Sequence, residues 1–438
     1  MKNDSSLPFL LVLLTALVMN SEELHSQSIA FEKPPIRYNE APVNNRVSQL
    51  ASQLRQQTAS LRWEDSHGYL KSILELLEIP VSSQTLVFSK TSMQIQHITP
   101  RTPRALYFND DTYVGWCHDG EIIEIATTDP RQGAIFYTIE QTQFDQPKLI
   151  RDRGQCITCH ASSRTQDVPG YLVRSMFVDA RGYPKFGSGT FLTDHTSPFD
   201  ERWGGWYVTG THGEMRHMGN EIAIGRDSDA RIDRDLGANV VDLAERFRVD
   251  RYLSPHSDLV ALMVLEHQTQ MHNAITAANF EARTALAQNQ QMNEVLDRPE
   301  GYLSESTERR LDRAAENVLK YMLMCDEFPL TSPVAGTSDF SEQFARAGIK
   351  DSQGRSLRDL DLQTRLFRYP CSFLIHSEAF ARLPAPVLTR TIDKLVDVLK
   401  GRDTSPSYAH LSRETRQAIL EILREQEPDL MAFQTKSE

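Results

Sequence analysis

The sequence predicts an α+β fold, with a helical N-terminal segment, a β-rich middle and a helical C-terminal half. Apolar residues recur at helical spacing before residue 80, short β-branched and aromatic runs fill the middle, and long helical periods return after residue 239. The chain has 438 residues, 40% of them hydrophobic, which is enough to bury one or two cores. We therefore divide it into residues 1–28, 29–80, 81–238 and 239–438.

The first segment, residues 1–28, has the features of an export signal. Residues 7–19 form an apolar stretch of 13 residues, which is too short to cross a bilayer as a helix but suits the core of a signal peptide. We expect cleavage near residues 26–28 and a periplasmic or otherwise exported protein, with an uncleaved anchor as the alternative. No later stretch is apolar and long enough to span a membrane, so the mature chain is expected to have no span.

Along the next segments the spacing of apolar residues changes from helical to strand-like. Residues 43–79 carry two runs of helical spacing. The runs "TLVFSK", "RALYFND", "TYVGWC", "EIIEIATT" and "AIFYTIEQ" predict strands, and Asp119-Gly120 is a good turn between two of them. Residues 171–194 and 204–225 read as hairpins around glycine-containing turns.

Helical patterns dominate the C-terminal half. A long helix is predicted within residues 254–288, with Ser257 as its N-terminal cap. Further helices are expected at residues 304–325, 384–400 and 411–425, the second with Pro386 near its first turn and Gly401 just after its end.

The net charge of −12 argues against nucleic acid as a partner. Binding to a phosphate backbone requires a cationic surface, and no basic run or patch stands out in the sequence.

The stretch "RGQCITCHASS" is the strongest functional signal. Cys156 and Cys159 bracket two residues, and His160 follows at once. A redox-active C-x-x-C normally opens a helix in a thioredoxin-like unit, and no such pattern surrounds it. A structural zinc site needs a second pair of ligands, whereas Cys117, Cys325 and Cys371 are isolated. A disulfide explains the thiols but not the histidine.

A c-type haem explains all three residues. Each vinyl group takes one sulfur as a thioether, and the adjoining imidazole binds the iron from one face. We therefore predict one covalent haem c in the β-rich middle, held by Cys156 and Cys159 with His160 as the iron ligand. Cys117-His118 is not a second attachment site, because position 114 is valine. The three other cysteines permit at most one disulfide, and its pairing is open.

A family resemblance points the same way. "RALYFNDDTYVGW", "CITCH", "DERWGGWYVTGTHGEMRHMGN" and "LDLQTRLFRYPCSFLIHSEAF" resemble a family of functionally uncharacterised exported bacterial proteins that carry one cytochrome c attachment motif. The resemblance spans most of the mature chain. It implies a haem protein of unassigned activity, with Cys156, Cys159 and His160 as the functional positions.

The sixth position of the iron decides the chemistry, since methionine, histidine or an open site each favour a different function. Met218 is the preferred candidate and His217 the second; consecutive strand residues face opposite sides, so at most one of them faces the iron. His267 and His272 do not share a helical face and are not expected to chelate a metal. Other candidates in the same region are Met176, His195, His212 and Met215.

Several side chains near the motif suit a haem environment. A backbone carbonyl near Pro169 is placed to accept the second N–H of His160. Trp203, Trp206 and Tyr207 either wall the porphyrin or form sheet core. Arginines that are expected to pair with the haem propionates, or else to be solvated, are Arg151, Arg153, Arg164 and Arg174.

Two functions from different classes fit these features. The first is an exported c-type cytochrome that transfers electrons to a redox partner protein. The second is a peroxidase-like haem enzyme with an open or displaceable sixth iron position, which the length of the chain favours because a simple carrier needs only about 100 residues. No distal acid, base or arginine can be named, so electron transfer ranks first. A haem sensor is a third, weaker reading, since no signalling module is visible.

Overall fold

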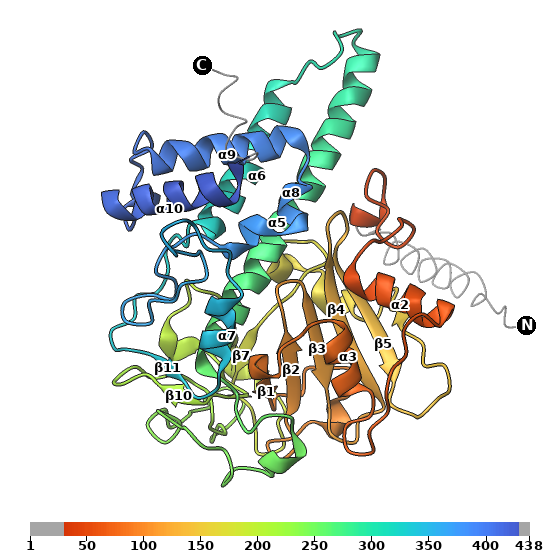
Figure 1. The fold of residues 1–438 in the computed structure, drawn as a ribbon, viewed down its shortest axis with the longest axis vertical. Helices are drawn as coiled ribbons and strands as arrows, with labels where there is room; N and C mark the ends of the chain where they lie inside the picture. Colours follow the sequence, from red (N-terminus) through yellow and green to blue (C-terminus); the bar gives the residue numbers. More distant parts are fainter. Residues whose placement is uncertain (1–29, 429–438) are drawn as a thin grey trace, which may run out of the picture.

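The computed structural model describes residues 30–428 and is a mixed α/β structure built around a seven-stranded antiparallel sheet (Figure 1). The strand order is β6-β5-β4-β3-β2-β1-β9. The prediction of helices combined with antiparallel strands is confirmed. The predicted signal peptide at residues 1–28 lies outside the described residues. In the part described, none of the helices has the length and apolar character that a membrane span requires.

The sheet strands lie close to the positions that their alternation predicts. β2 to β5 are joined in sequence by short connections, with Asp119 at positive φ in the turn between β3 and β4. Two helices, α2 (Arg46–Gln56) and α3 (Leu70–Leu76), precede the sheet. The first five strands are β1 (Thr85–Val87), β2 (Arg104–Phe108), β3 (Thr112–Trp116), β4 (Ile122–Asp129) and β5 (Gly133–Glu140).

One face of the sheet is fully covered by the N-terminal helices. Tyr107, Val114, Ile125 and their neighbours on this face pack in one cluster with residues of α2 and α3, such as Leu50 and Ile73. Figure 1 shows both helices in front of the strands. This face is ordinary hydrophobic core.

The opposite face is different, because several of its side chains are only partly buried. Alternate residues along the central strands point to it. Arg104, Leu106, Tyr113, Glu124 and Ala126 all retain partial exposure, whereas the residues between them are buried. We call this the open face of the sheet.

The segment after β5 contains small strands and the motif formed by Cys156, Cys159 and His160. These elements are β6 (Ile150–Arg151), α4 (Ile157–His160), β7 (Arg174–Met176), β8 (Thr190–Leu192), β9 (Trp206–Tyr207) and β10 (Gly210–Thr211). β7 and β8 pair, as the predicted hairpin at 171–194 requires. The hairpin predicted at 204–225 is wrong: β9 pairs with β1, and β10 pairs with β11 (Ala335–Gly336).

The C-terminal half is mainly helical. α5 (Leu259–Val295) runs behind the sheet in Figure 1 and extends beyond it. Its cap is Asp258, not the predicted Ser257: the Asp258 carboxylate accepts from the amides of Val260 and Ala261, while the Ser257 hydroxyl donates to the carbonyl of Tyr207. The remaining helices are α6 (Glu305–Met322), α7 (Phe340–Arg346), α8 (Glu378–Ala381), α9 (Ala385–Leu399) and α10 (Arg413–Gln426).

Buried histidines make stability depend on pH. Burial lowers the pKa of each below its ordinary value near 6.5, so the folded state binds fewer protons than the unfolded state as pH falls below 6.5. Burial raises the pKa of Glu266 and Glu327 to about 7, so these two groups act in the opposite direction between about pH 4.5 and 7. The histidines concerned are His67, His160, His195, His212, His217, His267, His272 and His410.

Because the histidines outnumber the two carboxyl groups, we expect the free energy of unfolding to fall as pH decreases from 7 to 5. Each pKa unit by which one histidine is lowered contributes about 1.4 kcal/mol to this loss. Urea unfolding at several pH values measures the dependence. In Glu266→Gln the opposing carboxyl is absent, so the acid loss should become steeper; an unchanged slope would contradict this account.

Candidate haem site

The Cys156–His160 motif lies on the short helix α4 (Ile157–His160) and the residue before it. The carboxylate of Asp152 accepts hydrogen bonds from the backbone amides of Gly154, Gln155 and Cys156, at 3.0–3.3 Å. The chain then turns into α4, where the amide of His160 donates to the carbonyl of Cys156 at 3.0 Å. Asp152 therefore fixes the start of the motif, and the side chains of Cys156 and His160, four residues apart, share one helical face.

The two thiols of the motif are free and accessible. Cys156 is half-buried and Cys159 is exposed, and none of the five cysteines, all within the described residues, forms a disulfide. Burial and the Asp152 carboxylate raise the pKa of the Cys156 thiol to about 12. A redox-active C-x-x-C needs a stabilised thiolate, so this environment disfavours thioredoxin-like chemistry.

The imidazole of His160 has a defined orientation. Its Nδ1 lies 3.0 Å from the carbonyl oxygen of Gly170, which only accepts hydrogen bonds, so the proton is on Nδ1 and the lone pair is on Nε2. Burial lowers the pKa of His160, which favours the neutral ring. The ring also lies 4.9 Å from that of Phe136, on the open face of the sheet. The carbonyl expected near Pro169 is thus that of Gly170.

Gly170 is held in place by α5. The amide of Gly170 donates to the carbonyl of His160 at 2.8 Å. Asn273 of α5 accepts from the amide of Tyr171 at 2.8 Å and donates to its carbonyl at 2.7 Å. A Cβ on Gly170 would lie 2.2 Å from the side-chain oxygen of Asn273, so only glycine permits this approach. The long helix therefore supports the carbonyl that orients His160.

An ion pair on the open face lies near the motif. Arg104 and Glu124 are 2.9 Å apart, and a Cβ on Gly115 would collide with the guanidinium, so that glycine makes room for the pair. Arg104 lowers the pKa of both His160 and Cys156, and Glu124 raises both. This pair is not among the site residues predicted from the sequence. The only sequence feature that points to it is the alternation in "EIIEIATT", which places a glutamate on the face opposite the buried isoleucines.

Met93 is a second residue that sequence analysis missed. Its sulfur lies 3.9 Å from that of Cys156, and its side chain is 43% exposed. The neighbouring Ser92 donates a hydrogen bond to Glu124 at 2.9 Å, which ties this loop to the open face. No sequence pattern marks Met93, because it lies more than 60 residues before the motif in an irregular segment.

The candidate sixth ligands make contacts of their own in the structure. Met218 is fully buried, and its sulfur accepts from Ser175 at 3.7 Å. Arg174, the preceding residue of β7, is near Cys159: burial and Arg164 lower its pKa, and Cys159 opposes them. Consecutive strand residues face opposite sides, so Arg174 and Ser175, which contacts Met218, point away from each other.

The other candidates are also engaged in core contacts. His217 accepts from the amide of Gly219 at 3.0 Å and packs on Trp203. His212 uses both ring nitrogens, toward the carbonyl of Met215 and the amide of Asn239. His195 donates to the carbonyl of Cys325, and Met176 and Met215 are buried in the hydrophobic clusters.

The histidines of α5 do not meet, as the helical spacing predicts. His267 contacts Ser372, whereas His272 donates to the carbonyl of Asp110. Within residues 30–428 no group of three or more His, Cys, Asp or Glu side chains is arranged to hold a metal ion.

The arginines and aromatic residues predicted to surround a haem have different surroundings in the structure. Arg151 bonds to the carbonyls of Tyr38 and Ala41, and Arg153 and Arg164 are exposed. Arg174, like Arg151, is half-buried. The aromatic residues Trp203, Trp206 and Tyr207 are buried in the two hydrophobic clusters.

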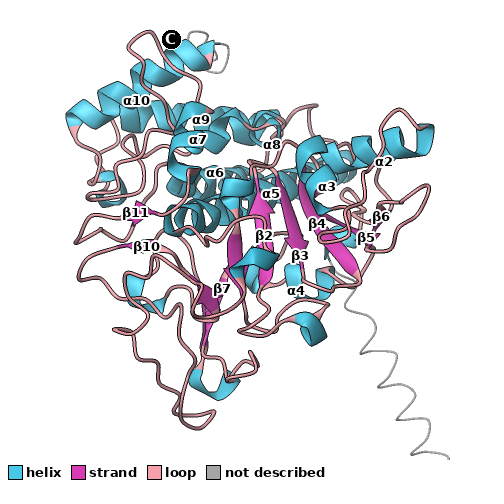
Figure 2. Cartoon of the chain, turned by 60° about the horizontal axis from the view of Figure 1, so that its bottom comes forward, coloured by secondary structure: helices cyan, strands magenta, loops and turns pink. Residues whose placement is uncertain are grey.

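The residues present fit a c-type haem. Two free sulfurs and an imidazole with its Nε2 lone pair available lie on one short helix, beside a half-exposed sheet face that carries Leu106, Ala126 and Phe136. Figure 2 shows α4 close to β4 and β5. The hydrogen bond from Nδ1 to a backbone carbonyl is the arrangement that orients metal-binding histidines.

For a haem attached at Cys156, we expect Met93 to be the nearer methionine, because its sulfur lies 3.9 Å from that of Cys156. We expect Met93→Leu to shift the absorption spectrum of the ferric haem protein, because it removes the thioether beside Cys156. Met218→Leu should leave that spectrum unchanged and cost less than about 1.5 kcal/mol of stability, as volume-conserving core changes do. A spectral change in the second variant alone would restore Met218 as the iron ligand.

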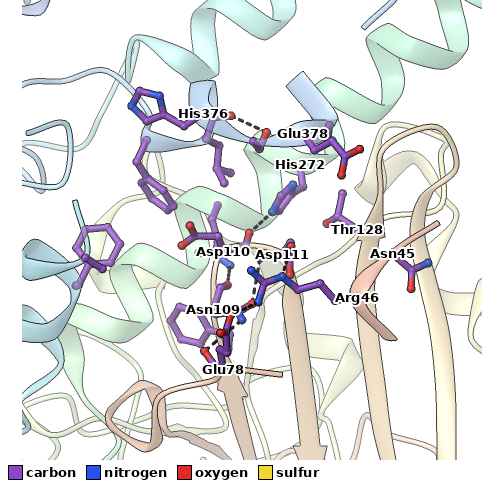
Figure 3. Close-up of a pocket in the computed structure, with 18 of the residues that line it drawn as sticks. Asn45, Arg46, Glu78, Asn109, Asp110, Asp111, Thr128, His272, His376 and Glu378 are labelled. Atoms are coloured by element: carbon purple, nitrogen blue, oxygen red, sulfur yellow. Dashed lines mark hydrogen bonds and ion pairs between the residues drawn. The ribbon is translucent and has the colours of Figure 1, made fainter. Parts of the chain in front are cut away.

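A separate, partly open cavity of about 910 Å³ lies at the turn between β2 and β3 and is lined by residues of α2, α5, α7 and α8 (Figure 3). None of residues 156–160 lines it. Comparison of the chain with protein-family models, with curated protein sequences and with solved structures gave no match.

Proposed function

We propose that the chain is an exported c-type cytochrome with one covalent haem that transfers electrons to a partner protein. The observation that carries the proposal is the His160 imidazole, whose Nδ1–H is bound to the Gly170 carbonyl while two free cysteines precede it on the same helix. The bound haem supplies a reversible one-electron couple. Cys156 and Cys159 hold the porphyrin, and His160 binds the iron.

The chain's own residues also shape the environment of the group. Gly170, supported by Asn273, orients the imidazole. The Arg104–Glu124 pair places a charge of each sign beside it, and guanidinium groups such as that of Arg174 suit propionate binding.

A peroxidase-like enzyme is the second candidate, and the cavity of about 910 Å³ is the observation that favours it. Because none of the motif residues lines that cavity, a substrate within it would not touch His160 or the two cysteines. Electron transfer therefore remains first.

The test is expression with the cytochrome c maturation machinery in an exporting host. We expect the mass of the secreted chain to equal the mature polypeptide plus one haem, and the colour to survive acid-acetone extraction. A colourless chain of bare polypeptide mass would end the proposal. Among coloured products, low-spin iron without a response to peroxide, cyanide or carbon monoxide supports the carrier, whereas high-spin iron that binds them supports the enzyme.

A further inference from the structure

We propose that the cavity beside α5 binds a small organic cation with an aromatic ring, and that its occupancy is transmitted to His160. The cavity, about 910 Å³, has the size of a small-molecule site and lies outside the haem motif. Binding of the cation depends only on the cavity, whereas transmission to His160 rests on the proposed function.

A continuous row of aromatic rings forms one wall. Phe108 lies 5.7 Å from Phe340, Phe340 lies 5.7 Å from Phe344, and Phe344 lies 5.1 Å from Phe373, measured between ring centroids. All four line the cavity. Ring faces attract cations, and a wall of this kind also stacks on aromatic ligands.

The wall already holds one cation of the chain itself. The guanidinium of Arg358 lies 4.8 Å from the centroid of Phe344 and 4.6 Å from that of Phe373, and it pairs with Asp110. Aromatic faces next to a carboxylate thus bind a planar cation at one end of the cavity. Phe108 and Phe340 continue the same row of rings and also line the cavity.

Carboxylates outnumber guanidinium groups in the lining. One of these carboxylates, Glu378, pairs with Arg382, which lies outside the lining. When Arg382 is counted together with the lining residues, an excess of one negative charge remains. An acidic, partly enclosed site attracts cations and repels anions. The charged lining residues are Glu78, Asp110, Asp111 and Glu378 against Arg46 and Arg358.

The cavity shares α5 with the haem motif. Figure 3 shows His272 at the cavity, bonded to Asp110 at the β2–β3 turn. The next residue, Asn273, holds the backbone of Tyr171 through two hydrogen bonds. Tyr171 follows Gly170, whose carbonyl orients the imidazole. A ligand that displaces this turn of α5 therefore alters the support of the iron ligand.

The binding arm uses 2-phenylethylammonium, its anionic counterpart phenylacetate, and ethylammonium, which lacks the ring. Calorimetric titration at low salt should give a dissociation constant on the order of 1 mM for the first, as expected for a ligand of this size. The other two should bind at least tenfold more weakly. Equal affinity for phenylacetate would overturn the charge argument, and equal affinity for ethylammonium would overturn the aromatic one.

Two variants place the binding in the cavity. Ala347 is exposed and lines the cavity, so Ala347→Trp places an indole ring inside it without disturbing the core and should abolish binding. Asp111→Asn should weaken 2-phenylethylammonium by about fivefold, because it removes one lining carboxylate. Glu305→Gln, the same change at an exposed site on α6, should leave the dissociation constant unchanged. Unaltered binding to Ala347→Trp would show that the ligand binds elsewhere.

The transmission arm titrates the same cation into the ferric haem protein and follows its absorption spectrum. We expect a saturable change with the dissociation constant found by calorimetry, and no change in Ala347→Trp. Binding without a spectral change would overturn transmission and leave the site intact. A chain that binds the cation but carries no haem would contradict the proposed function, not the cavity site.

Discussion

A chain in which both Cys156 and Cys159 are replaced by alanine will leave the maturation machinery without covalent haem. This is the largest effect that the structure predicts, because these two thiols are the accessible pair and the other three cysteines are buried. Thioether formation requires a sulfur that the haem vinyl groups can reach. Intact mass and the haem colour of the denatured chain measure the outcome.

The control for this experiment is Cys117→Ala. Cys117 directly follows the central strand β3 and is 1% exposed, and burial raises its thiol pKa, so it is a structural residue. This variant should retain one haem per chain. Each single change, Cys156→Ala or Cys159→Ala, should keep the haem through one thioether and shift the pyridine haemochrome band toward that of a haem with one free vinyl group. Covalent haem in the double variant would place attachment elsewhere.

The sheet was predictable because its signal is local. Alternation of apolar and polar residues marks each strand, and the structure places β2 to β5 within a few residues of the expected runs. The prediction of a hairpin at 204–225 was wrong because strand pairing is not a local property. Glycine-rich turns indicate that strands are present but not which strands pair, and β9 joins β1, which lies about 120 residues earlier in the chain.

The motif itself was visible in the sequence, but its surroundings were not. Two cysteines and a histidine at fixed spacing need no tertiary information. Met93 and Arg104 reach the site only through the fold, and no local pattern distinguishes them from surface residues. Ser257 and Asp258 are both good capping residues, so the sequence alone does not decide between them.

The second large effect concerns Gly170, and we expect Gly170→Ala to destabilise the protein by about 2 kcal/mol through overpacking. The added methyl group would lie 2.2 Å from the side-chain oxygen of Asn273, which cannot turn away without losing its two hydrogen bonds to Tyr171. The same clash displaces the carbonyl that accepts from His160, so the absorption spectrum of the ferric haem protein should also change. Urea unfolding and that spectrum are the two measurements.

Gly154→Ala is the matched control, since it lies on the other side of the motif and an added Cβ there meets no atom within 4 Å. It should change neither the free energy of unfolding nor the spectrum. Equal stability of the two variants would mean that Asn273 yields to the methyl group, so that α5 does not fix the Gly170 carbonyl. A stability loss in Gly170→Ala with an unaltered spectrum would separate the two roles: α5 would then stabilise the fold around His160 without setting the orientation of its ring.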